Sequence, residues 1–463
     1  LTVGVDDTGY DVKLFGATSG AYMLWDESAD DLKLVGAAGL TVAGDIDIDG
    51  TANLDVVDVD GAVNFAADVT YADGADIITA SAGTSNFRAG VNAGNSIASG
   101  GNYNVVVGDE AGTAITTGDQ NIAIGYVALQ SEDTGSRSIA IGYSALQNQN
   151  NDANNYNVAV GHEAGGAITT GVANTFIGGL AGDATDDGSY NAAVGYGALS
   201  ANCGNDNTAM GVSALAVNTA ASNTAFGRAA LAANTTGTRN VALGAEALEA
   251  NTTANDNTAV GYQALEAATT GGENTAMGNY SLKANTTGTN NVAIGDQALE
   301  ANTTAANNTG VGYRALEANT TGANNVAVGY NALDANTTAA SNTAVGYASL
   351  GTNTTGANNT SLGFESLYAN TTAANNTAVG YAALTANTTG TQNVSLGAYA
   401  LDANTTASYN NAFGYAALGA NTTGTQNNAF GFSALVTNTT GNNNVGMGQS
   451  ALTANTTGSS NVA

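Results

Sequence analysis

The sequence contains one cysteine, Cys203, and one histidine, His162, in 463 residues. A single cysteine excludes a disulfide framework within the chain, and one cysteine with one histidine cannot supply the four ligands of a typical zinc site. Catalysis by a Ser-His-Asp or Cys-His arrangement would have to use His162, and no nucleophile-elbow motif lies near it. We therefore interpret both residues as incidental members of a repeat.

Basic residues are also scarce: eight lysines and arginines stand against 38 aspartates and glutamates, which gives a formal net charge of −30. Such a chain repels phosphate backbones, so nucleic-acid binding is not expected. No run of about 18 apolar residues is present, so we expect no membrane span. The chain begins at Leu1 and its last residues, NVA, begin a further repeat, so we expect the natural protein to continue.

Repetition is the dominant feature of the sequence. From about residue 104 a unit of the general form NTAVGYQALEANTTAND recurs, with a glycine after its short apolar segment. This glycine stands at positions 108, 125, 142, 161, 178, 195, 211 and 227, and then recurs at equal intervals up to Gly448. The 21 copies include an earlier portion with spacings of 16, 17 or 19 residues, which indicates an older and more diverged part.

Aligning the copies on this glycine shows which positions are constrained. Asparagine stands four residues before it in 20 of 21 copies, as at Asn257, Asn274 and Asn291, and every copy has an apolar residue directly before it. With alanine mostly two residues before the glycine, this alternation has the period of a strand. Leucine follows four residues later in 18 copies, including Leu265 and Leu299. The NTTG or NTTA remainder is typical of turns.

A unit of about 17 residues is too short for the helix pairs of helical solenoids, so we predict an all-β fold. In this fold, a parallel β-solenoid, each coil has two short strands and two turns and advances about 4.8 Å, which makes a rod on the order of 100 Å long. Gly261, Gly278 and Gly295 then form one column, and the asparagines form another in which each amide donates to one neighbour and accepts from the next. Because so thin a coil buries little apolar area, we expect rods to associate.

We assign residues 87–463 to this rod and residues 1–86 to a different region. The first 86 residues contain 16 of the 38 acidic residues and the only tryptophan, Trp25, with alternating runs such as DVKLF and AGDIDIDG. Short β-strands joined by glycine turns are expected here. We interpret the region as a connector to an upstream part of the particle or as a small separate β domain.

The segments NVAIG (291–295), SIAIG (138–142), NVAVG (325–329) and NIAIG (121–125) resemble the strand motif of trimeric autotransporter adhesin heads of the YadA type. Similar repeats occur in bacteriophage tail fibres, and residues 1–36 resemble the N-terminal segments of marine phage fibre proteins. The resemblance implies a left-handed β-roll and three chains side by side, each packing an apolar face at the threefold axis. The unit is longer than the adhesin unit, and no long heptad stalk is present, which favours the phage fibre.

We therefore expect a structural protein without enzymatic activity, the shaft of a trimeric tail fibre in a virion or otherwise outside the cell. Its expected partners are two further copies, upstream particle proteins and, through a distal part, a host-surface glycan or protein receptor. A bacterial surface adhesin or extracellular filament is the alternative. A polysaccharide depolymerase needs a pair of carboxylates in a cleft, and the repeats offer only scattered acids such as Glu246, Glu249, Glu266 and Glu300.

Three aspartates in the first region are candidate metal ligands. Asp45, Asp47 and Asp49, followed by Gly50, resemble the start of a calcium loop. Position 12 of that loop would be Val56 instead of the bidentate glutamate that calcium requires. A strand with one solvated acidic face is the alternative, and we expect no other cofactor.

Two columns of repeated residues can each be interpreted either as part of the structure or as a surface that is bound or modified. Tyr262, Tyr313, Tyr330 and Tyr347 directly follow the glycine and form either a stacked ladder or a sugar-binding surface. The NTT segment matches the N-glycosylation sequon thirteen times, from residue 234 onward, and we interpret it as turn residues. An ice-binding face would need a flat threonine array on strands, whereas these threonines are expected in turns.

Overall fold

The computed structural model describes residues 12–17, 19, 21–26, 31–35, 43 and 81–463. The chain divides into two units, Leu1–Asp76 and Ile77–Ala463, which are considered separately below. Every regular element among the described residues is a β-strand, so the predicted all-β class is confirmed.

The first unit contains a small antiparallel sheet of three strands, β1 (Val12–Phe15), β2 (Tyr22–Asp26) and β3 (Asp31–Val35). The central strand β2 pairs with both others, so that Leu14 lies opposite Met23 and Met23 opposite Leu34. The expected β-rich character of the N-terminal region is therefore present in the described part.

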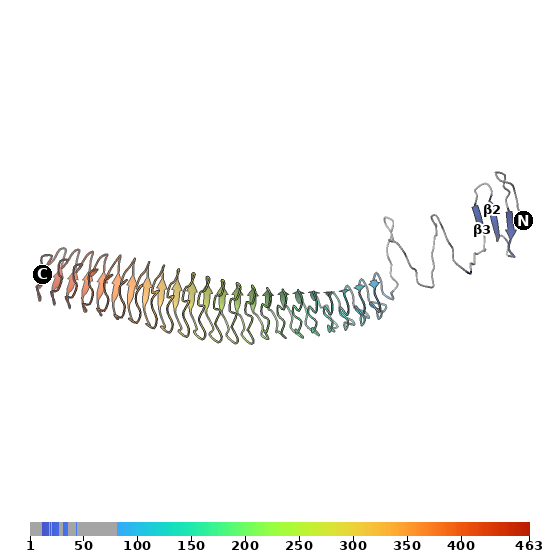
Figure 1. Ribbon diagram of the computed structural model, residues 1–463, viewed down its shortest axis with the longest axis horizontal. Coiled ribbons are helices and arrows are strands. Elements are labelled where there is room, and N and C mark those ends of the chain that lie inside the picture. The colour runs from blue at the N-terminus through green and yellow to red at the C-terminus, as the bar shows by residue number, and fades with distance from the viewer. Residues whose placement is uncertain (1–11, 18, 20, 27–30, 36–42, 44–80) are drawn as a thin grey trace. The chain divides into compact units, whose positions relative to one another are not determined.

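The second unit is a stack of parallel strands with three residues each (Figure 1). The strands are β4 (Phe87–Ala89), β5 (Val105–Val107), β6 (Ile122–Ile124), β7 (Ile139–Ile141), β8 (Val158–Val160), β9 (Thr175–Ile177), β10 (Ala192–Val194), β11 (Thr208–Met210), β12 (Thr224–Phe226), β13 (Val241–Leu243), β14 (Thr258–Val260), β15 (Thr275–Met277), β16 (Val292–Ile294), β17 (Thr309–Val311), β18 (Val326–Val328), β19 (Thr343–Val345), β20 (Thr360–Leu362), β21 (Thr377–Val379), β22 (Val394–Leu396), β23 (Asn411–Phe413), β24 (Asn428–Phe430) and β25 (Val445–Met447).

Each strand between β4 and β25 pairs in parallel with the strand of the coil before and the coil after, and these two end strands pair with one neighbour each. In β14 and β15, for example, Ala259 lies opposite Ala276 and Val260 opposite Met277. The predicted parallel β-solenoid, with a coil for each copy of the repeat, is therefore confirmed. The structure adds one coil that the repeat count omitted, because β4 precedes the glycine at position 90.

The coil contains one strand, where two had been predicted. In the coil of Gly261 the rest of the backbone turns through left-handed residues, with φ of 61° at Asp256, 53° at Gln263 and 53° at Leu265. The Leu265 N–H donates to the Ser281 carbonyl of the next coil at 3.0 Å, so a backbone ladder runs here without strand geometry. Non-glycine residues seldom adopt positive φ, and the sequence pattern did not reveal this turn.

The core is a narrow row of small side chains inside the stack of coils. The middle residue of each strand and the leucine four residues after the glycine point inward; Ala259, Leu265 and Leu299 are all fully buried. Gly261 has φ of 135°, and a Cβ there would lie 2.5 Å from the carbonyl oxygen of Gly278. Only glycine therefore allows successive coils to approach this closely, which explains the column that includes Gly295.

Three early coils that lack the leucine fill the same volume in another way. Gly112 and Gly165 stand in place of leucine, and Ile115 occupies the adjacent core space in the first of these coils, where a Cβ on Gly112 would meet it at 2.8 Å. In the third coil, the Phe176 ring lies 2.7 Å from the position of a Cβ on Gly182. Core volume is thus conserved although the residues differ.

Candidate functional site

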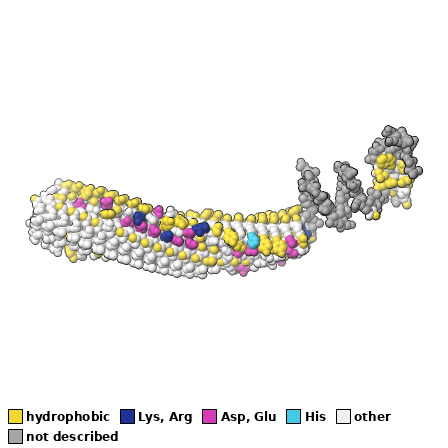
Figure 2. All heavy atoms as spheres, in the orientation of Figure 1, with side chains coloured by type: hydrophobic (Ala, Val, Ile, Leu, Met, Phe, Trp, Pro, Cys, Tyr) yellow, Lys and Arg dark blue, Asp and Glu magenta, His cyan; other side chains and the backbone are white. Residues whose placement is uncertain are grey.

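The residue directly before the glycine forms a column that we call the strand-end column, from Val107 to Met447. Each of its members is partly or largely exposed, although all are apolar. Leu243 is 47% exposed, Leu362 46% and Leu396 45%. Rows of apolar side chains run along the solenoid in Figure 2. The residues three before the glycine, mostly valines and threonines, are also at least partly exposed and flank this column. We call the two columns together the outer strand face.

The tyrosine column, directly after the glycine, is a stack of aromatic rings. The ring centroids of Tyr313 and Tyr330 are 5.1 Å apart, those of Tyr330 and Tyr347 5.3 Å and those of Tyr347 and Phe364 5.0 Å, with the last two pairs within 9° of parallel. Each ring thereby covers the faces of its neighbours. Sugars bind aromatic rings by stacking on their faces, and these faces are covered here. This part of the column therefore presents only ring edges and hydroxyl groups to a ligand.

The two residues that are unique in the sequence occupy ordinary column positions. The His162 ring stacks on Tyr143, with centroids 4.9 Å apart and planes at 10°. Cys203 is buried and lies 3.4 Å from the Thr185 hydroxyl, and burial raises the pKa of its thiol. A buried thiol with a raised pKa is a poor nucleophile.

The first asparagine column, four residues before the glycine, joins the coils through side chains. The Asn274 backbone N–H donates to Asn257 Oδ1 at 3.0 Å, and the Asn291 N–H donates to Asn274 Oδ1 at the same distance. The Asn274 Nδ2 also donates to the Gly288 carbonyl at 2.9 Å. The predicted amide-to-amide bond is also present, from Asn274 Nδ2 to Asn257 Oδ1 at 3.2 Å, and the sequence pattern did not reveal the shorter bond from the backbone N–H.

A second asparagine column, seven residues after the glycine, was not recognised from the sequence. The Asn302 Nδ2 donates to Asn285 Oδ1 at 2.9 Å, and the Asn319 Nδ2 to Asn302 Oδ1 at 2.9 Å. These asparagines begin the NTT segments, and all of the thirteen except Asn455 are buried. The twelve buried amides are therefore structural and inaccessible to glycosylation in the folded chain. The recurrence of these asparagines with the period of the coil was the signal in the sequence from which this column could have been predicted.

This second column is interrupted once, at Ala268. Asn251 Oδ1 is buried there without a hydrogen-bond partner, while every Asn–Asn step from Asn285 to Asn455 is bonded. A buried unpaired acceptor costs about 1–3 kcal/mol. The interruption therefore marks a weak step in the stack.

The threonines of the NTT segments lie in turns, as expected. The first threonine bonds to the next coil: the Thr303 hydroxyl donates to the Thr320 carbonyl at 3.1 Å, and the Thr320 hydroxyl donates to the Thr337 carbonyl at 3.0 Å. These hydroxyls are thus engaged within the protein, which argues against an ice-binding role for this column.

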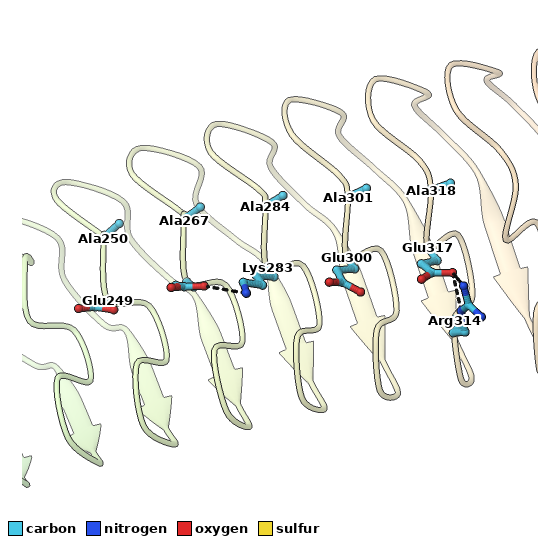
Figure 3. Close-up of a pocket in the computed structure, with 11 residues that line it drawn as sticks. Glu249, Ala250, Ala267, Lys283, Ala284, Glu300, Ala301, Arg314, Glu317 and Ala318 are labelled. Atoms are coloured by element: carbon cyan, nitrogen blue, oxygen red, sulfur yellow. Dashed lines mark hydrogen bonds and ion pairs between the residues drawn. The ribbon is translucent and has the colours of Figure 1, made fainter.

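A charged groove of about 850 Å³ runs along one flank of five coils (Figure 3). Alanines such as Ala267 and Ala284 line it together with the charged residues Glu249, Glu266, Lys283, Glu300, Arg314 and Glu317. Lys283 Nζ lies 3.5 Å from Glu266 Oε2, and Arg314 forms an ion pair with Glu317. The acids that look scattered in the sequence therefore lie side by side.

At one end of this groove three carboxylates meet. Oxygens of Glu246, Glu249 and Glu266 lie within 4.8 Å of one another. Burial, followed by the negative charges of Glu246 and Glu266, raises the pKa of Glu249, whereas hydrogen bonds from Gln263 and Arg228 lower the pKa of Glu246. Glycoside hydrolysis uses two neighbouring carboxyl groups of this kind, one with a raised pKa and one with a lowered pKa.

An internal polar cluster surrounds Glu132, which is fully buried. Its carboxylate accepts hydrogen bonds from the Gly135 N–H at 2.7 Å, Gln149 Nε2 at 2.8 Å and Asn155 Nδ2 at 2.9 Å. Burial raises its pKa, although the bonds from Gln149 and Gly135 lower it. Glu132 and Gln149 occupy the position of the second asparagine column in two successive coils, and Asn155 lies in the widest interval between glycines, from Gly142 to Gly161.

The candidate calcium ligands Asp45, Asp47 and Asp49 lie outside the described residues. Within the described ranges, no helix has the length and hydropathy that crossing a membrane requires. Comparison with known protein families, curated proteins and solved structures gives no match to the chain.

Proposed function

We propose that this chain is the shaft of a homotrimeric fibre, a structural protein that holds a receptor-binding part away from the surface to which the fibre is attached. The supporting observation is the outer strand face, whose strand-end column is apolar and at least partly exposed in all 21 coils from Val107 to Met447. At about 4.8 Å per coil, this column is roughly 100 Å long. Exposed apolar patches of such extent mark interaction sites.

Further copies of the chain are the partners that fit this surface best. The column repeats with the period of the coil, so a parallel copy presents the same pattern along its whole length. The resemblance to autotransporter heads and phage tail fibres supports three copies with left-handed coils, and a location in a virion or outside the cell. A tail-fibre shaft would join upstream particle proteins to a distal part that binds a host-surface glycan or protein.

The proposed role is mechanical and requires no catalysis. Fibre length follows from the number of coils, and stiffness from the two asparagine columns and the strand ladder. Three chains acting together would increase the avidity of a weakly binding tip.

A set of lysine substitutions on the outer strand face tests the trimer. Leu243→Lys, Leu362→Lys and Leu396→Lys together place charges in the proposed interface, and we expect light scattering to show a monomer where the unmodified chain is a trimer. Thr253→Lys, Thr372→Lys and Thr406→Lys in the same coils change exposed turn residues and serve as the control. A monomeric unmodified chain, or lysine variants that stay trimeric, would contradict the proposal.

The carboxylate cluster favours a second candidate function, hydrolysis of a polysaccharide. Glu249 would donate a proton to the leaving oxygen, and ionised Glu246 would act as nucleophile or base. Release of reducing ends from capsular polysaccharide or lipopolysaccharide, lost in Glu249→Gln, would support it. Equal activity of the variant, or none in either protein, would exclude this role for the cluster.

A further inference from the structure

The register of β1, β2 and β3 sorts the side chains of this sheet onto two faces. One face, which we call the apolar sheet face, carries Val12, Leu14, Met23, Trp25, Leu32 and Leu34. Leu14 is 54% exposed, Trp25 42% and Leu32 59%. The sheet thus presents an entirely apolar face with large exposed side chains.

The opposite face is mixed, with charged side chains among apolar ones: Lys13, Lys33 and Asp26 together with Phe15, Tyr22 and Leu24. Lys13 Nζ lies 3.3 Å from the centroid of the Tyr22 ring, and Lys33 forms an ion pair with Asp26. Among the described residues of this unit, only Ala21 is buried. Because a three-stranded sheet is stable only when an apolar face is packed, the apolar sheet face is the one that needs a partner.

The size of this face limits what the partner can be. Three strands of four or five residues cover at most about 14 by 17 Å, or roughly 240 Å². A stable complex between independent proteins buries about 800 Å² on each partner. The face is therefore too small to hold a free protein, but it suffices for a partner that is already tethered nearby, since tethering raises the effective concentration to about the millimolar range.

Copies of this chain are such tethered partners once their solenoids associate. We propose that the apolar sheet faces of the copies pack against one another and form a second, N-terminal association site of the fibre. Trp25 and Met23 lie on the central strand β2, at the middle of the proposed contact, and both residue types are enriched at the cores of interfaces. The inference rests on the trimer proposed above.

Cysteine cross-linking in the full chain tests this contact. Leu32→Cys on the apolar sheet face and Phe15→Cys on the opposite face are compared in a Cys203→Ser background. We expect Leu32→Cys to form disulfide-linked chains about ten times faster, because proximity raises its local concentration. Phe15 is the more exposed residue, at 76%, so exposure alone predicts the reverse order.

The outcomes separate this inference from the proposed function. Trimers in which Leu32→Cys cross-links no faster than Phe15→Cys would overturn the N-terminal contact and leave the shaft proposal standing. A monomer by light scattering would overturn both.

Trp25 gives a measurement that needs no substitution in the sheet. In the assembled fibre we expect blue-shifted emission that acrylamide quenches weakly, and a red shift with stronger quenching when the three lysines on the outer strand face separate the chains. Unchanged Trp25 emission and quenching on dissociation would overturn the proposal, since the face would then be covered by its own chain or remain exposed.

Discussion

At the residue scale, one position of the second asparagine column lacks an amide side chain. Ala268 leaves Asn251 Oδ1 unpaired between coils whose other asparagines are bonded. Ala268→Asn would supply the missing donor to Asn251, as Asn302 does to Asn285 at 2.9 Å. We expect a gain of about 1 kcal/mol in the free energy of unfolding, measured by urea titration followed by circular dichroism.

Ala301→Asn, at a residue that lines the groove, is the matched control, because it adds the same amide where no column is interrupted. It should leave the stability nearly unchanged. A loss of stability in Ala268→Asn would show that this site cannot hold the side chain that the other coils hold.

The exchange of core volume between Phe176 and Gly182 permits a swap experiment. Gly182→Leu alone places a side chain where the Phe176 ring lies, 2.7 Å from the position of a Cβ. Overpacking of this kind costs about 1–3 kcal/mol or more. Adding Phe176→Ala recreates the usual pair of alanine and leucine, so the double variant should recover most of the loss in a double-mutant cycle. Additive losses would contradict this account of the core.

Some of these residues were predictable and others were not. The inward leucines, such as Leu265, and the asparagines that include Asn257 follow from recurrence within one chain, because a stack places equal positions above one another. The second asparagine column was missed because the letters NTT are equally typical of a turn. Glu246 and Glu249 lie in one coil and Glu266 in the next, so their convergence depends on how the coils stack, which the order of the acids in the sequence does not show.

At the scale of the element, the coil has one strand and three left-handed residues besides its glycine. The sequence predicted the first strand from its period of two, and a second strand was predicted only from the length of the 17-residue unit. In that second segment, what alternates is the backbone handedness, visible at Gln263 and Leu265. The side-chain pattern alone does not distinguish a strand from a segment whose backbone alternates in handedness.

Because each coil contacts its neighbours through equivalent columns, whole coils should be removable. Deletion of residues 296–363 joins Gly295 to Phe364 and takes out four complete coils. We expect a folded rod that is shorter by about 19 Å, measured by electron microscopy of stained particles. Deletion of residues 296–355 breaks the period and should unfold the junction; equal stability of both deletions would argue against the column account.

At the scale of the whole molecule, the net charge of −30 is accompanied by several carboxyl groups that are partly or fully buried. Burial raises the pKa of Glu132, Asp183, Glu300, Asp334 and Asp402 above their ordinary values. The stability from these groups is fully present below their unfolded pKa of about 4 and is lost as pH rises through the raised folded values.

The chain should therefore melt at a higher temperature at pH 5 than at pH 8. Thermal unfolding at constant ionic strength measures this difference. Asp334→Asn with Asp402→Asn should flatten the dependence, since two of the groups no longer titrate. A melting temperature that falls on acidification from pH 8 to pH 5 would contradict the assignment.

The left-handed residues of the coil also determine how the solenoid can begin to fold. Each costs about 1 kcal/mol or more in backbone energy, and the hydrogen bonds that hold Gln263 and Leu265 come from the coils on either side. An isolated coil has this unfavourable backbone energy but lacks those hydrogen bonds. The first few coils must therefore form together as a folding nucleus. Later coils then add to an existing end one at a time. Refolding should consequently show a lag followed by rapid growth, although every contact spans only one coil in the sequence.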